Sequence, residues 1–78
     1  MPKILEVHGY KFYLYTDDHL PIHVHVWKGG SEAKIVLDPE ITIKDNYGFK
    51  SQELRQILGV IIEHCEFIIE KWYEIHNK

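Results

Sequence analysis

Three histidines fall within seven positions of this sequence, at His19, His23 and His25. Imidazole titrates near neutral pH and is the commonest neutral metal ligand, so such a cluster can bind a metal, transfer protons or recognise a polar ligand. His23 and His25 are two positions apart and therefore share one face of a β-strand. Pro21 favours an extended backbone before it and predicts a loop that brings His19 to the start of that strand.

A metal site is the first hypothesis. His19, His23 and His25 supply up to three nitrogen ligands for a zinc-like transition metal, and Glu32 adds an oxygen donor. Lys34 is predicted to lie opposite His25, where its ammonium group raises the electrostatic cost of binding a cation. Apart from such a metal, no cofactor is expected.

Catalysis without metal is the second hypothesis, with His23, His25 and Lys34 as the catalytic residues. Lys34 disfavours the imidazolium form of His25 and leaves a neutral ring that can act as a general base. The same lysine can neutralise a phosphate while His23 or His19 acts as the acid. This set suits a ribonuclease-like phosphodiesterase.

Recognition of a ligand is the third hypothesis, and it is the one that we favour. The polar face that holds the histidines also carries large aromatic side chains, and exposed patches of this kind mark interaction sites. The predicted binding residues are Tyr13, Tyr15, His19, Trp27 and Glu32.

Two predicted β-hairpins position these side chains. The first spans residues 3–16 and turns at His8-Gly9, and the second turns at Gly29-Gly30, because both dipeptides suit the positive φ values of tight hairpin turns. Two-residue closure of the second hairpin pairs His25 with Lys34. The opposite, apolar face is predicted to enter the core and holds Leu5, Val7, Tyr10, Phe12, Leu14, Val24, Val26, Ala33, Ile35 and Leu37.

From Ser51 onward the apolar residues recur every three or four positions, which predicts one amphipathic helix. Ser51 is the expected N-cap, and Glu53 lies in the first turn, where a carboxylate is favourable. A helix that runs to His76 is nearly 40 Å long at ~1.5 Å per residue. Val60 and Phe67 lie on its flank, where they form either the seam of a homodimer or part of a broad contact between the helix and the sheet.

The predicted fold is α+β. An antiparallel sheet of four to five strands occupies residues 1–45, ends with a short strand over 41–44 and a turn over 45–48, and packs on one long C-terminal helix over 51–77. Residues 1–78 form a single domain.

Composition narrows the class of protein. The 78 residues are 45% hydrophobic and 27% charged, which is typical of a folded globular domain rather than a disordered one. A formal charge of −3 argues against a broad nucleic-acid footprint, although local basic patches remain compatible with it. The single cysteine, Cys65, forms no internal disulfide, and no apolar run is long enough to span a bilayer. We therefore expect a cytoplasmic protein without membrane contact.

Motifs along nearly the whole chain match one family. They are Gly9-Tyr10-Lys11-Phe12-Tyr13, Asp18-His19-x-Pro21-x-His23-Val24-His25-Val26, Glu32-Ala33-Lys34, Gly48-Phe49, Glu53-Leu54 and Glu63-His64, with Trp72 near the end. This pattern resembles the small bacterial proteins catalogued as domain of unknown function 4160, although members carry Pro-Pro where this chain has Pro21-Ile22.

The resemblance implies a bacterial or phage single-domain cytosolic protein, often encoded beside another small protein, with toxin–antitoxin-like pairing. It implies no established activity. The shared residues fall on His19, His23, His25, Glu32 and Lys34, on the face that hairpin pairing predicts independently.

The leading function hypothesis is therefore a binding module of a toxin–antitoxin-like pair that engages a protein or nucleic-acid ligand. The alternatives are the metal-independent phosphodiesterase and the transition-metal-binding protein. The expected partner is a small protein or a second copy of the chain, with nucleic acid as a further alternative.

Overall fold

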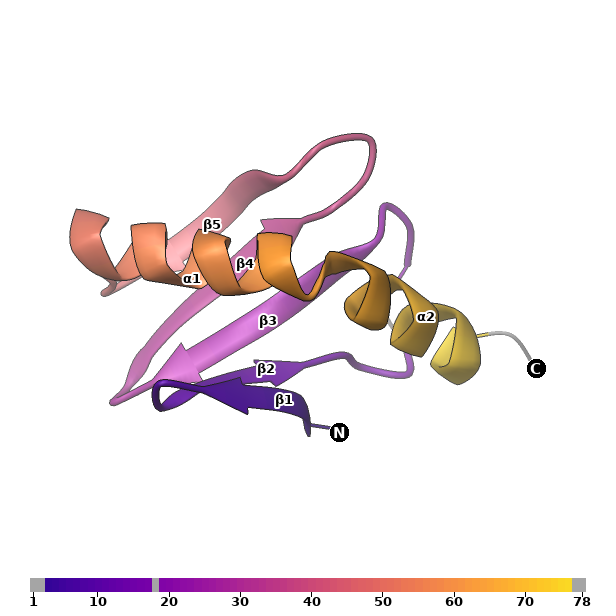
Figure 1. Ribbon diagram of the computed structural model, residues 1–78, viewed down its shortest axis with the longest axis horizontal. Helices are drawn as coiled ribbons and strands as arrows, with labels where there is room; N and C mark the ends of the chain where they lie inside the picture. Colours follow the sequence, from indigo (N-terminus) through magenta and orange to yellow (C-terminus); the bar gives the residue numbers. More distant parts are fainter. Residues whose placement is uncertain (1–2, 18, 77–78) are drawn as a thin grey trace.

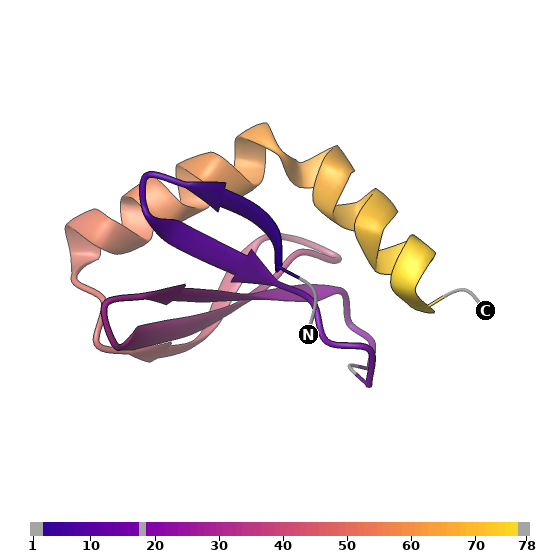
Figure 2. The ribbon, with the colours of Figure 1, turned by 90° about the horizontal axis from the view of Figure 1, so that it is seen from below.

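An antiparallel sheet with helices on one face makes up the chain, as the α+β prediction requires (Figures 1 and 2). The structure is a computed structural model and describes residues 3–17 and 19–76. Within these ranges the strands are β1 Lys3–Val7, β2 Tyr10–Tyr13, β3 His23–Lys28, β4 Ser31–Val36 and β5 Thr42–Tyr47, and the helices are α1 Ser51–Glu63 and α2 Cys65–His76.

The strands follow one another across the sheet in the order β1-β2-β3-β4-β5, each antiparallel to its neighbour. Both predicted hairpin registers are confirmed: Val7 pairs with Tyr10, and His25 pairs with Lys34. The turns form where expected because His8-Gly9 and Gly29-Gly30 all adopt positive φ, as a two-residue hairpin loop requires.

The predicted apolar faces of the hairpins form the core. Phe12, Val24, Val26 and Ile35 have no exposed side-chain surface. Leu5 and Val7, on the outer strand β1, are partly buried against the same core. The helices complete it with the residues Ile57, Val60, Ile61, Ile68 and Trp72.

The single long helix predicted over 51–77 is wrong, because the helix breaks at His64, where φ is −110° and ψ is 20°. Figure 2 shows α2 bending down over the end of the sheet. The bend lets Ile61 of α1 and Ile68 of α2 both reach full burial in one core. A straight helix of nearly 40 Å would exceed the longest extent of the molecule, 36 Å. Asn77, the last residue of the predicted helix, lies outside the described residues.

The segment between β5 and α1 also differs from expectation. β5 continues to Tyr47 instead of ending at Lys44, because the Asn46 side chain closes the turn farther on: its Oδ1 accepts from the Phe49 N–H at 3.0 Å. The N-cap of α1 is Lys50 rather than Ser51. Its N–H donates to the Glu53 carboxylate at 2.9 Å, which satisfies a backbone donor at the helix start.

The predicted dimer seam does not form as a pair. Val60 is only 6% exposed and packs in the core of its own chain, so it is unavailable to a second copy. Phe67 is 36% exposed and lies beyond the break at His64. Val60 therefore takes part in the contact between the helix and the sheet, which is the alternative to a homodimer seam. In the described part of the chain, no helix has the length and apolar character needed to cross a membrane.

Candidate functional site

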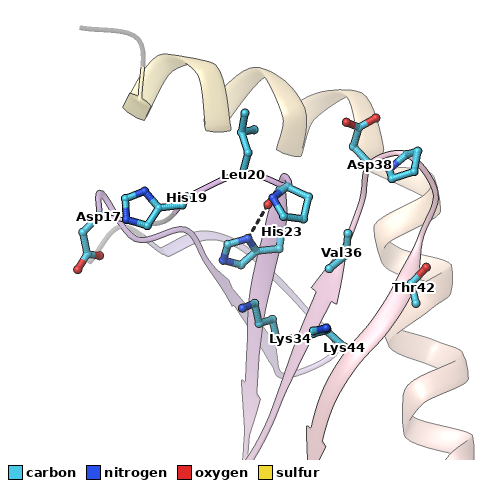
Figure 3. A pocket seen from close by; sticks show the side chains of 11 residues that line it. Asp17, His19, Leu20, His23, Lys34, Val36, Asp38, Thr42 and Lys44 are labelled. Carbon is cyan, nitrogen blue, oxygen red and sulfur yellow. Dashed lines mark hydrogen bonds between the residues drawn. The ribbon is translucent and has the colours of Figure 1, made fainter.

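A pocket of about 570 Å³ lies on the sheet face opposite the helices, where β3, β4 and β5 meet two loops (Figure 3). Lys34 and Val36 alternate along β4 with the buried Ala33 and Ile35, so they point away from the core. We call this cavity the loop pocket. Its lining residues are Asp17, His19, Leu20, Pro21, His23, Lys34, Val36, Asp38, Pro39, Thr42 and Lys44.

Two proline-containing loops form the walls of the loop pocket. The peptide bonds Leu20–Pro21 and Asp38–Pro39 are both cis. The Leu37 N–H donates to the Ile22 carbonyl oxygen at 2.8 Å and ties the ends of the two loops together. The walls are therefore fixed to each other as well as to the strands.

A β-bulge places a second lysine in the loop pocket. Lys34 pairs with Asp45 and the next residue, Ile35, pairs with Ile43, which leaves Lys44 as the extra residue on β5. Bulges redirect side chains in this way. Figure 3 shows Lys34 and Lys44 side by side at one end of the pocket. Two ammonium groups from neighbouring strands favour an anion at this end.

His23 forms the back of the loop pocket. It is only 4% exposed, and its Nδ1 lies 2.8 Å from the Pro21 carbonyl oxygen. Because a carbonyl oxygen only accepts hydrogen bonds, Nδ1 carries the hydrogen of this contact. The contact holds the ring against the loop wall.

Behind His23, aromatic rings from the loop after β2, from β3 and from α2 form a continuous chain of ring contacts, the histidine–aromatic cluster of Tyr15, His23, His25, Trp72 and His76. Ring centroids are 4.3 Å apart for Tyr15 and His25, 5.1 Å for His25 and His23, 5.4 Å for His23 and Trp72, and 4.0 Å for Trp72 and His76. This cluster connects the loop pocket to α2.

His76 closes the histidine–aromatic cluster at its far end. Its Nδ1 lies 2.8 Å from the Trp72 carbonyl oxygen, one helical turn back. Its Nε2 lies 3.1 Å from the Tyr15 carbonyl oxygen, just after β2. The ring therefore ties the end of α2 to the sheet.

The predicted binding face divides into two parts. The loop pocket brings together His19, His23 and Lys34, whereas His25 does not line it. The ring of His25 packs between Tyr15 and His23, and its Nε2 is shielded from solvent. The predicted catalytic set His23, His25 and Lys34 therefore does not surround one cavity.

The other predicted binding residues lie beside this cavity. Tyr13 stacks on Tyr15 with centroids 6.5 Å apart, and the Trp27 Nε1–H donates to the Tyr15 hydroxyl at 3.3 Å. Glu32 lies directly across from Trp27. These side chains form an aromatic ridge next to the histidine–aromatic cluster and away from the pocket.

The predicted metal ligands do not assemble. Within residues 3–17 and 19–76, no group of three or more His, Cys, Asp or Glu side chains could hold a metal ion, so His19, His23 and His25 do not form such a set. The reason is geometric: His19 is exposed on the loop, the Nδ1 of His23 is committed to a carbonyl, and the His23 and His25 rings meet edge to face.

Sequence reasoning missed several residues that the fold brings to this region. Lys44 and Asp38 line the loop pocket, Trp72 covers His23 from behind, and His76 stacks on Trp72. The spacing of Trp72 and His76, one helical turn apart, was a usable signal. No local pattern marks the bulge that selects Lys44.

The chain matches the model of the family described as Domain of unknown function (DUF4160) over residues 9–73. This protein belongs to that family. The matched range runs from the first hairpin turn into α2 and so includes the loop pocket. Asp18, part of the motif that carries the resemblance, lies outside the described residues. No curated protein and no solved structure matches the chain.

Proposed function

We propose that this protein is a binding module and that the loop pocket receives an anionic group of its ligand. The observation that carries the proposal is the pair Lys34 and Lys44, brought from neighbouring strands to one end of a cavity of about 570 Å³. That volume lies within the ~300–1,000 Å³ usual for ligand sites.

The surroundings of the lysines support a preformed site. Lys34 is half-buried, and His23 behind it is held by its contact with the Pro21 carbonyl. Thr42 adds a hydroxyl group to the pocket lining. The Thr42 hydroxyl already donates to the Glu40 carbonyl oxygen at 3.4 Å, so the two ammonium groups are the donors that suit a carboxylate or a phosphate here.

We propose that the ligand is a small protein partner, as in a toxin–antitoxin-like pair, whose aspartate or glutamate side chain enters the loop pocket. The family resemblance supports a partner encoded nearby. We also propose a bacterial, cytosolic setting, which the single cysteine, Cys65, supports because disulfide frameworks belong to oxidising compartments.

A titration of the ¹⁵N-labelled protein with acetate and with inorganic phosphate tests the anion site. We expect saturable NMR shift changes at the amides of Lys34, Lys44 and their neighbours. In the double variant Lys34→Met and Lys44→Met these changes are lost, because the long apolar methionine keeps most of the packing and removes the charge.

Lys11→Met is the matched control, since Lys11 is exposed on β2 and does not line the loop pocket. Its NMR shift changes on addition of acetate or phosphate should match those of the wild type. The proposal fails if the double variant shows the same changes, or if shifts spread evenly over every lysine.

A further inference from the structure

We propose that the group received by the loop pocket is dipolar: its negative end lies at Lys34 and Lys44, and its positive end lies at Asp38. This inference rests on the proposed function and deepens it. The ligand is a segment of a partner protein that presents an acidic and a basic side chain together.

The charges of the loop pocket are separated along the strand direction. Lys34 lies within β4, whereas Asp38 lies two residues beyond the end of that strand. Figure 3 shows Asp38 at the opposite end of the pocket from Lys34 and Lys44, with Val36 between them. Asp17 lies beside His19 on the other loop, across the pocket from Asp38, and so does not belong to the same end.

The Asp38 carboxylate is available to a ligand. Asp38 is exposed and lines the same cavity as the lysines. A ligand that is only anionic meets favourable charge at one end and repulsion at the other. A ligand with a cationic group at its far end matches both ends.

The middle of the loop pocket is apolar. Leu20, Pro21, Val36 and Pro39 lie among the lining residues, and Leu20 is 73% exposed, which leaves a large aliphatic surface uncovered. Aliphatic stems, such as those of a lysine and a glutamate, would cover this surface while their charged ends reach the two poles.

This pattern disfavours a nucleic-acid strand as the ligand. A strand repeats its negative charge at every nucleotide, so phosphates beyond the first would approach Asp38 or Asp17. The formal charge of −3 adds no long-range attraction for a polyanion. Nucleic acid is therefore an outcome of the test and not the proposal.

Two matched small molecules test the dipole. Hexanoate and 6-aminohexanoate share a carboxylate and a six-carbon chain, and only the second carries a terminal ammonium group. We expect calorimetry or NMR titration to show about two- to five-fold tighter binding of 6-aminohexanoate, the range of a part-exposed ion pair. The longer pair, octanoate and 8-aminooctanoate, covers a greater charge separation.

Variants assign the preference to residues. Asp38→Asn should remove the preference and leave the binding of hexanoate the same or tighter, whereas Asp17→Asn should keep the preference. Lys34→Met should weaken the binding of both hexanoate and 6-aminohexanoate. Glu40→Gln is the matched control, because Glu40 is exposed near Asp38 without lining the pocket, and it should keep the preference.

The outcomes separate the two proposals. If neither amino acid binds more tightly than its parent carboxylate, or if the preference survives the loss of Asp38, the dipolar ligand is overturned and the anion site stands. If neither molecule binds at the lysines, the anion site itself is overturned. Tighter binding of a short single-stranded oligonucleotide than of the zwitterions also overturns the dipolar ligand.

Discussion

Neighbouring positions on one strand can have different environments. His23 and His25 share a face of β3, yet His23 reaches the loop pocket while His25 packs against Tyr15. Trp72 of α2 packs against His23 at the end of the sheet, whereas Tyr15 packs against His25. The chemistry available to each ring therefore depends on which neighbour covers it.

Tyr10 offers a test at the same scale. It is 1% exposed, its hydroxyl donates to Gln56 Oε1 at 2.7 Å, and burial raises the pKa of the phenol above 10.0. The folded protein thus keeps a proton that the unfolded chain releases above pH 10. Stability from this group is complete below that pH and is lost as pH rises through the folded pKa.

We therefore expect Tyr10→Phe to lose about 1 kcal/mol at neutral pH through the missing hydrogen bond. Above pH 10 the variant should lose less stability than the wild type as pH increases. Urea unfolding at several pH values measures both effects. Parallel curves of stability against pH for Tyr10→Phe and the wild type would contradict the prediction.

At the scale of elements, the helix break and the β5 bulge shape the site more than any single side chain does. The break at His64 brings α2 over His23, and the bulge brings Lys44 beside Lys34. The break changes the direction of the helix while its backbone hydrogen bonds continue. The His64 N–H donates to the Val60 carbonyl oxygen, and the Ile68 N–H donates to the His64 carbonyl oxygen.

Alanine substitutions at two glycines, one in α1 and one just after β5, should change the stability of the protein in opposite directions. Gly59 is exposed in α1, and a Cβ there would meet no atom within 4 Å, so Gly59→Ala should stabilise the protein by ~0.5–1 kcal/mol. Gly48 follows β5 with φ of +106°, and a Cβ would lie 2.6 Å from the Ser31 hydroxyl oxygen. Gly48→Ala should cost more than ~1 kcal/mol.

Chemical denaturation of both alanine variants measures the two effects. Equal stabilities would contradict the assigned backbone of the β5–α1 connection. A destabilising Gly59→Ala would instead indicate that this face of α1 is covered.

At the scale of the whole molecule, one core serves the sheet and both helices. Ile57 and Ile61 of α1, like Ile68 and Trp72 of α2, join the residues of β2, β3 and β4 in a single cluster. A domain of this size buries only ~60–65% of the surface that its unfolded chain exposes. Loss of α2 would uncover part of that core, so we expect α2 and the sheet to unfold together.

Tryptophan fluorescence can check this cooperativity. In Trp27→Phe the remaining tryptophan is Trp72, which is 3% exposed on α2. Its emission should shift at the same denaturant concentration as the loss of far-ultraviolet circular dichroism, as two-state unfolding requires. An earlier fluorescence transition would show that α2 leaves the sheet before the rest unfolds.

The sequence by itself determined the hairpins and the face that each strand buries. Turn geometry at Gly29-Gly30 and the two-residue alternation along β3 and β4 are local properties, so the pairing of His25 with Lys34 followed from them. The amphipathic helical region was equally local, because its apolar spacing shows which side faces the sheet.

Only the tertiary structure decided where the helix bends and where the loop pocket lies. The apolar spacing continues through His64, so no local signal marks the break; burial of Ile68 and Trp72 against the end of the sheet determines it. The pocket needs two loops and a bulge from separate parts of the chain. Such long-range packing is settled by the whole core and not by neighbouring residues.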